Sequence, residues 1–243
     1  MKTVVVLQPQ FFPWRGVFEQ IRLADEFVHL DDAQFQKGGF TNRVQIKTAN
    51  GPLWLTVPVL RSGKLPPIAE VEIDYANDWR EKHLRTFAMS YARAPFLGAA
   101  QNILTDVYAE RPGTIAELDI AALERCCAEL ELRPHFTRAS STPVDGAKTD
   151  RLAALLVPRG ATRYVTGLGA LDYLDAPRLA AAGIDVRVMQ YARHPYRQLH
   201  GAFDPHVSIL DAIANLGPAT ASALESPAIP WDDVVAAAAQ VAG

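Results

Sequence analysis

An α/β fold is predicted by two short apolar runs near the start of the chain, by a helix-spaced segment between them, and by the return of this alternation beyond residue 135. Residues 3–8 and 26–30 have the apolar composition of strands buried on both faces. Residues 16–24 carry Val17, Ile21 and Ala24 at helical spacing. This strand–helix–strand unit predicts a Rossmann-like, mostly parallel sheet flanked by helices.

Two insertions interrupt the alternation. Residues 44–48 and 53–59 are β-rich and flank Asn50-Gly51, two residues that tolerate the positive φ of a tight turn. A hairpin insertion is therefore expected at about 43–59, followed by a further strand at 68–74. Apolar residues three or four apart then predict a helical block at about 78–131, with helices over 78–94, 96–110 and 114–131.

The rest of the chain returns to alternating strands and helices. Strands are predicted at 135–139, 163–166 and 185–191, and helices at 147–156 and 176–182. The C-terminal part is expected to form short helices at 207–215, 219–224 and 232–241. The sequence contains no internal repeat and no evident linker, so we expect residues 1–243 to form a single domain.

Composition narrows the class of protein. The 243 residues carry 24 Lys and Arg against 27 Asp and Glu, and this net charge of −3 argues against a partner such as duplex nucleic acid. No apolar run approaches the ~18 residues of a membrane span, and the first apolar run is too short for a signal peptide. Cys126 and Cys127 are adjacent and are expected to pack in a core, without a disulfide or a zinc site. A cytoplasmic location is expected.

The loop after the first strand is the first candidate for a binding site. It leaves the carboxyl end of a strand and enters a helix, which is where ligands bind in open α/β sheets. Gln8 offers a hydrogen-bond donor and an acceptor, and Trp14 offers a stacking face, so both are predicted to contact substrate. The alternative is a rigid aromatic loop that closes the end of the sheet.

Asp31, Asp32 and Gln34 follow the second strand at the same predicted edge. The two carboxylates are suited to a divalent cation or to orienting a substrate amine or hydroxyl. Side chains alternate in direction along a strand, so at most one of the two carboxylates points into a site. The alternative is that they cap a turn or a helix.

Two further groups carry possible chemistry. Asn42 and Arg43 are suited to a carboxylate or phosphate, although an Arg in a loop is more often a solvated surface group. His83 shares a helix face with Trp79 and Phe87 and is either a general base or a buried structural histidine.

The richest polar cluster lies between residues 191 and 211. His194 is the candidate general acid or base there, and Tyr196 and Gln198 are candidate substrate ligands. His194, His200 and His206 are six residues apart, which matches no zinc motif, so no metal site is predicted. Ser208 is expected to be a helix N-cap. Neither common nucleotide-binding fingerprint is present in the sequence.

These motifs resemble the WbqC-like protein family over nearly the whole chain. The most specific blocks are Gln8-Pro9-x-x-Phe12-Pro13-Trp14-x-Gly16 and Leu30-Asp31-Asp32-x-Gln34. Weaker matches are Asn42-Arg43, Trp79 with His83, Lys148-Thr149-Asp150, and His194-Pro195-Tyr196-x-Gln198. Val44 and Arg197 depart from the family pattern.

The resemblance implies a tailoring enzyme of surface-polysaccharide or natural-product assembly, one that transfers an acyl or aminoacyl group to an amine. In that hypothesis His194 or His83 deprotonates the attacking amine, and Asp31 or Asp32 orients that histidine or binds the ammonium group. Asn42 and Arg43 then hold a carboxylate, a phosphate or the developing oxyanion, and a carrier-protein or coenzyme A thioester is the expected donor. No particular cofactor or oligomeric state is predicted. The alternatives are a nucleotide-dependent activating enzyme with Mg²⁺ at Asp31 and Asp32, similar to nucleotidyltransferases of the HIGH class, and a non-catalytic binding or scaffold protein.

Overall fold

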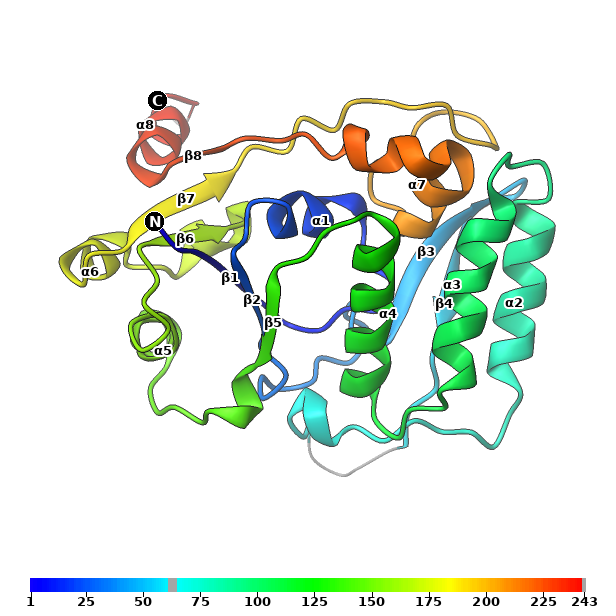
Figure 1. The fold of residues 1–243 in the computed structure, drawn as a ribbon, viewed down its shortest axis with the longest axis horizontal. Coiled ribbons are helices and arrows are strands. Elements are labelled where there is room, and N and C mark those ends of the chain that lie inside the picture. Colours follow the sequence, from blue (N-terminus) through cyan, green and yellow to red (C-terminus); the bar gives the residue numbers. More distant parts are fainter. Residues whose placement is uncertain (61–64, 242–243) are drawn as a thin grey trace.

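A six-stranded sheet with strand order β5-β2-β1-β6-β7-β8 forms the centre of the computed structural model, which describes residues 1–60 and 65–241 (Figure 1). Neighbouring strands are parallel from β5 to β7, and β8 is antiparallel to β7. The strands are β1 (Thr3–Leu7), β2 (Glu26–His29), β5 (His135–Arg138), β6 (Arg163–Thr166), β7 (Asp185–Met189) and β8 (Ala228–Pro230). The predicted α/β class and mostly parallel sheet are confirmed.

Alternating side chains of the strands serve two separate cores. Val5 faces a large core that contains residues of α1 (Arg15–Ile21), α4 (Ile115–Glu129) and α7 (Ile209–Leu216). Val4 and Val6 face a smaller core built with α5 (Lys148–Leu156) and α6 (Ala176–Ala181). Burial of both faces explains why the strands are continuous apolar runs.

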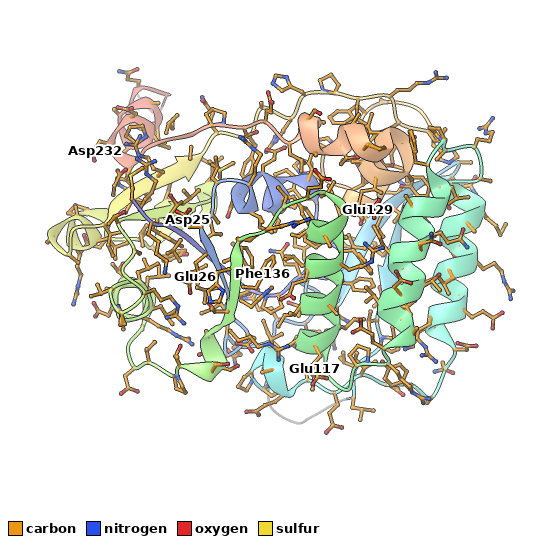
Figure 2. The ribbon with its side chains drawn as sticks, viewed as in Figure 1. Asp25, Glu26, Glu117, Glu129, Phe136 and Asp232 are labelled. Atoms are coloured by element: carbon orange, nitrogen blue, oxygen red, sulfur yellow. The ribbon has the colours of Figure 1, made fainter. Side chains whose placement is uncertain are left out.

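The two predicted insertions lie on the side of the large core. β3 (Arg43–Thr48) and β4 (Gly51–Thr56) form the expected hairpin, which is a separate two-stranded sheet. The helical block contains α2 (Trp79–Ser90), α3 (Leu97–Ala109) and α4, which stand side by side in Figure 1. Figure 2 marks Glu117 and Glu129 at the two ends of α4. Cys126 and Cys127 are fully buried on α4, and this burial raises the pKa of both thiols.

Two sequence-based expectations about elements are wrong, and one strand was not predicted. Residues 68–74 form no strand: they contain a short 3₁₀ turn, and Glu72 and Ile73 make only isolated bridges to neighbouring loops. The expected helix over 219–224 is also a 3₁₀ turn. The short strand β8 was not predicted. It is flanked by Pro227 and ends at Pro230, and an edge strand tolerates proline where no ladder hydrogen bond is needed. The strand is followed by the expected C-terminal helix, α8 (Trp231–Val241).

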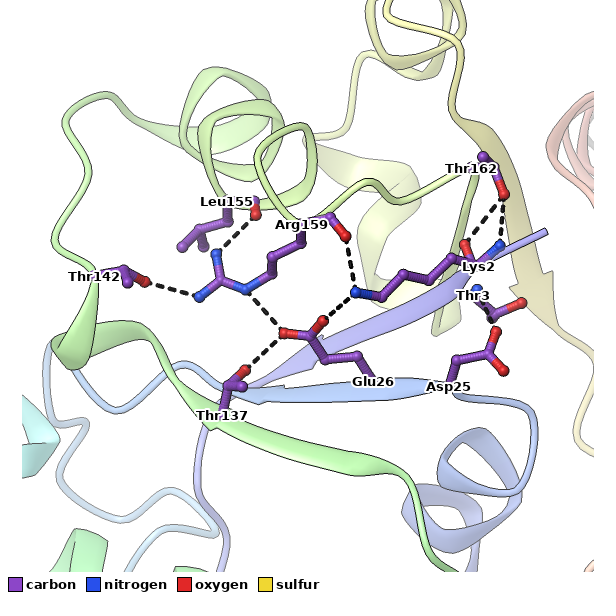
Figure 3. A network of polar contacts seen from close by, with 9 residues as sticks. All are labelled: Lys2, Thr3, Asp25, Glu26, Thr137, Thr142, Leu155, Arg159 and Thr162. Carbon is purple, nitrogen blue, oxygen red and sulfur yellow. Dashed lines mark hydrogen bonds and ion pairs between the residues drawn. The ribbon is translucent and has the colours of Figure 1, made fainter.

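The amino ends of the strands are joined by a buried ionic network (Figure 3). The Glu26 carboxylate accepts hydrogen bonds from Arg159 Nε at 3.1 Å and from the Thr137 hydroxyl at 3.0 Å, and it pairs with Lys2 Nζ at 2.8 Å. Burial opposes ionisation of Glu26, but these partners outweigh it and lower its pKa. The network fixes the end of the sheet that lies opposite the predicted site.

None of the helices in the described part of the chain combines the length and the apolar character that crossing a bilayer requires.

Candidate functional site

A cleft of about 700 Å³ opens where β1 and β6 lie side by side at their carboxyl ends. The chain leaves β1 for α1 on one face of the sheet and leaves β6 for α6 on the other, so this is the point at which the strand order reverses. Open α/β sheets bind ligands at such switch points. The cleft is lined by Leu7, Gln8, Gln10, Trp14, Val17, Gln20, Gln36, Thr166, Gly167, Leu168, Gly169, Ala170, Tyr173, Tyr191, Arg193 and His206.

The chemistry of this lining is amide-rich and cationic. It includes four glutamine side chains together with Arg193 and His206, while none of the described lining residues is Asp or Glu. Glutamine amides both donate and accept hydrogen bonds, and the guanidinium attracts an anionic group. The cleft is therefore suited to a ligand that carries carbonyl or hydroxyl groups beside a negative charge.

Gln20 and Tyr191 form a polar pair in the cleft. The Gln20 side-chain amide donates to the Tyr191 hydroxyl, and the Gln20 oxygen has no partner among the described residues although the residue is only 2% exposed. Burial raises the pKa of Tyr191 to about 12, so its hydroxyl keeps its proton at neutral pH and remains a hydrogen-bond donor. A Cβ at Gly167 would lie 3.4 Å from both groups, so the glycine leaves the pair open to the cleft.

Trp14 forms one wall of the cleft. Its ring centroid lies 4.8 Å from that of Tyr191 and 5.4 Å from that of His206. The ring lies directly against Gly16, where an added Cβ would come within 2.3 Å of the indole. A glycine at the second position of α1 is therefore what allows the indole to fold back onto the helix and face the cleft.

A buried ion pair in α1 holds the segment that carries Arg193. Arg15 donates to Glu19 at 2.6 Å and to the backbone carbonyl of His194 at 2.9 Å. The Ser226 hydroxyl donates a hydrogen bond to the Glu19 carboxylate at 2.5 Å and accepts one from the backbone N–H of Ala192 at 3.0 Å. Both neighbours of Arg193 are thus anchored to α1, and the Arg193 side chain is left to line the cleft.

A second network positions His206. The Gln198 side chain bonds both backbone groups of Asp204, at 2.8 and 3.0 Å, and the Asp204 carboxylate accepts the backbone N–H of His206 at 2.9 Å. Lys47 Nζ donates to Gln198 at 3.0 Å, which links this turn to the hairpin. Gln198 therefore supports the turn that presents His206.

The structure separates the residues that the sequence proposed for the site. Of these residues, Gln8 and Trp14 line the cleft, and His194 lies beside it, exposed and next to Arg193. The Tyr196 hydroxyl donates to Asp211 at 2.7 Å and accepts from Gln198 at 3.0 Å, so Tyr196 belongs to the supporting network. The N-cap role expected of Ser208 is confirmed at the start of α7.

Asp31, Asp32 and Gln34 make contacts away from the cleft lining. Asp31 is buried and accepts the backbone N–H and the hydroxyl of Ser140, at 2.9 and 2.6 Å, so it caps the turn after β5. Asp32 pairs with Arg151 at 2.5 Å. Gln34 is exposed and donates to a backbone carbonyl, that of Leu65, at 3.3 Å.

Asn42 and Arg43 lie on the hairpin. The Asn42 amide donates to the carbonyl of Val57 at 2.9 Å, and the Arg43 guanidinium donates to Gly38 and stacks over Trp54 at 4.3 Å. Neither side chain belongs to the lining of the switch-point cleft.

His83 lies in a second cleft, of about 620 Å³, between β4 and α2. Its Nδ1 is 3.0 Å from the buried hydroxyl of Tyr108, and its ring contacts those of Trp79 and Phe11. Burial lowers the pKa of His83 to about 4, so its imidazole is neutral at neutral pH. The structure does not bring His83 and His194 into one site.

His83 should make the protein sensitive to acid. The pKa of His83 falls from 6.5 to about 4 on folding. Between these pH values His83 is protonated in the unfolded chain and neutral in the folded protein, so the unfolded state binds one more proton. The contribution of the neutral His83 to the free energy of unfolding should be fully present above pH 6.5. It should be lost as the pH falls towards 4, which lowers the free energy of unfolding by about 3 kcal/mol. His83→Gln should remove this part of the dependence in denaturant titrations at pH 7 and 4.5. His135→Gln, at an exposed histidine, should keep it; equal acid sensitivity of both variants would contradict the assignment.

Sequence reasoning did not select several cleft residues. Thr166 ends β6, and Gly167 after it belongs to Gly167-Leu168-Gly169, which the sequence marks only as suggestive; the rule that placed Gln8 at the end of β1 applies equally to both residues once the two strands are neighbours. His206 and Arg193 lie within the polar cluster noted in the sequence. Gln20 carries only a weak signal, namely a polar side chain on a short helix whose residues are all buried.

Among the residues that the structure describes, no three His, Cys, Asp or Glu side chains come together as a group that could hold a metal ion.

Comparisons with known proteins agree with the motifs. The sequence profile of the WbqC-like protein family matches residues 8–223. Uncharacterized protein Rv1507c of Mycobacterium tuberculosis is 35% identical over 220 residues, which are 89% of this chain and 95% of the relative. No solved structure matches the chain.

Proposed function

The chain belongs to the WbqC-like protein family, and from this premise we propose that it is a transferase that moves an acyl or aminoacyl group from a thioester to an amine in the switch-point cleft. One observation carries the proposal: the cleft brings a proton-accepting imidazole, a cationic side chain and hydrogen-bond donors to the same edge of the sheet. These are the groups that aminolysis of an activated carbonyl requires. Surface-polysaccharide or natural-product assembly, which the family resemblance implies, is the proposed setting.

The residues of the cleft have separate roles in this reaction. The amine nitrogen bonds to the carbonyl carbon of the donor, the C–S bond breaks, and its electron pair leaves on sulfur. His206 takes the proton from the nitrogen and returns it to the departing thiolate. The hydroxyl of Tyr191 donates to the developing oxyanion, and Arg193 binds the anionic carrier of the thioester. In this scheme the acyl group passes directly from the thioester to the amine, without a covalent acyl-enzyme intermediate.

The strand order favours a second candidate, a nucleotide-dependent activating enzyme. Dinucleotides and mononucleotides bind open parallel sheets at the switch point, and here Gly167 and Gly169 follow β6 at that point. In this alternative the cleft holds a nucleoside triphosphate, and Arg193 contacts its phosphates.

Thermal-shift measurements separate these candidates. Coenzyme A thioesters, carrier-protein thioesters, nucleotide sugars, and ATP or CTP with Mg²⁺ are added in turn. A ligand at 100 times its Kd stabilises the protein by ~2.7 kcal/mol, which is about 5–10 °C for a chain of this size. We expect a shift with thioesters, and formation of an amide from amino sugars or amino acid esters, followed by mass spectrometry.

A pair of glycine variants assigns the binding to the cleft. Gly167→Val should abolish the shift because its side chain covers Gln20 and Tyr191, while Gly98→Val, at an open position on α3, should retain it. A shift only with ATP or CTP and Mg²⁺ would overturn the transferase proposal in favour of the activating enzyme. The absence of any shift or product would leave a binding or scaffold role as the better account.

A further inference from the structure

An apolar groove of about 350 Å³ continues the switch-point cleft along β7 towards α8. Leu168, Tyr191 and Arg193 line both spaces, so the two are contiguous. The far part of the groove is lined by the apolar residues Met189, Ile229, Val234 and Ala237 and by Gln190. Figure 1 shows α8 beside β7 and β8, at the end of the molecule away from the helical block.

The lining of the groove differs sharply from that of the cleft. Apart from the exposed Gln190, the residues that line only the groove have aliphatic or thioether side chains, whereas the cleft holds four glutamines and His206. Val234 and Ala237 are three residues apart and lie on the same face of α8, towards the groove. Val235, their neighbour, is 45% exposed and is not part of the groove lining.

We infer that this groove binds the aliphatic chain of the donor, and that the enzyme therefore accepts medium-length acyl groups. The inference rests on the proposed acyl transfer for the identity of the ligand. The continuity of the two spaces gives the geometry: a thioester carbonyl beside Tyr191, with its anionic carrier at Arg193, would have its hydrocarbon chain next to Leu168 and the groove.

The size of the groove sets the expected chain length. At roughly 30 Å³ for each small group, the volume that liquid water gives one molecule, the space holds about twelve non-hydrogen atoms. Burial of one methylene group improves affinity by about three- to fourfold. Affinity should therefore rise steadily with chain length and level off at about ten to twelve carbons.

Binding of a homologous series tests the inference without requiring turnover. N-acetylcysteamine thioesters of acetate, butyrate, hexanoate, octanoate, decanoate and tetradecanoate are titrated calorimetrically into the full chain. The Kd should fall about tenfold for every two methylenes up to decanoate and then change little. Val234→Trp should fill the groove, so that the gain ends at butyrate or hexanoate. Val235→Trp, on the adjacent exposed position, should keep the wild-type response.

The outcomes separate this inference from the proposed function. A Kd independent of chain length, no binding of any thioester, or equal responses of Val234→Trp and Val235→Trp would overturn the groove assignment. If short thioesters still yield amide product, the transferase proposal survives that result. If the chain-length response is present and no amine is acylated, the groove assignment stands and the transferase proposal falls. A dimer in sedimentation that is lost only in Val234→Trp would assign the groove to a second copy and overturn the inference.

Discussion

His206→Asn should lower kcat for amide formation by about 10²–10⁴-fold, the usual contribution of a positioned general base. The imidazole lines the cleft 5.4 Å from the Trp14 ring, and its turn is fixed by the bonds from Gln198 to Asp204. Asparagine preserves the polarity and the turn but cannot accept the proton of the amine. Binding of the thioester should change little, because Arg193 and the groove remain, so the measurement is kcat together with Kd for the donor.

His194→Asn is the matched comparison, since the sequence alone proposed His194 for the same role. His194 is exposed and is not among the residues that line the cleft, and its backbone carbonyl is held by Arg15. We expect a loss below tenfold for this variant, and no change for His135→Asn, at the amino end of the edge strand β5 and away from the cleft. A larger loss in His194→Asn than in His206→Asn would return the base to His194. The acid limb of the pH–rate profile should disappear in the variant that removes the true base.

The order of elements was predictable from the sequence, but their neighbours in space were not. Local periodicity identified β1, β2, β6, β7 and the helices around them, because each element buries a face that its own pattern reveals. No local pattern states that β6 lies beside β1. The cleft exists only because these two strands are neighbours, so Gln8 was found from its place in the chain and Thr166 was not.

The same limitation of local reasoning explains the acidic pair and His83. Asp31 and Asp32 do follow β2, as predicted, but their partners Ser140 and Arg151 are more than a hundred residues away in the chain. The sequence correctly predicted that His83 and Trp79 lie on the same face of a helix. Its hydrogen-bond partner Tyr108 comes from α3 and could be found only from the tertiary packing. A sequence pattern identifies a side chain that is capable of catalysis or binding. Its partners in the tertiary structure decide whether that side chain serves the stability of the fold instead.

Asp211→Ala should destabilise the folded protein by about 3–5 kcal/mol, the largest loss of stability that we expect from one substitution. Asp211 is fully buried on α7 and accepts the hydroxyls of Tyr91 at 2.8 Å and Tyr196 at 2.7 Å. Burial raises its pKa, although both tyrosines and Lys47 oppose that shift. Alanine leaves two buried hydroxyls without an acceptor, each costing about 1–3 kcal/mol, and removes the counter-charge near Lys47. In thermal unfolding the Tm should fall by about 6–20 °C.

Asp211→Asn and Asp106→Ala are the comparison variants for this loss of stability. Asparagine retains one acceptor and should lose about half as much stability, whereas Asp106 is 56% exposed in its pair with Arg125, and its loss should cost less than about 1 kcal/mol. Asp211 holds Tyr196, and Tyr196 accepts from Gln198, which supports the turn of His206. Asp211→Asn should therefore also lower kcat at temperatures where the protein remains folded. A fully active, destabilised Asp211→Asn would separate the two networks and confine Asp211 to the stability of the core.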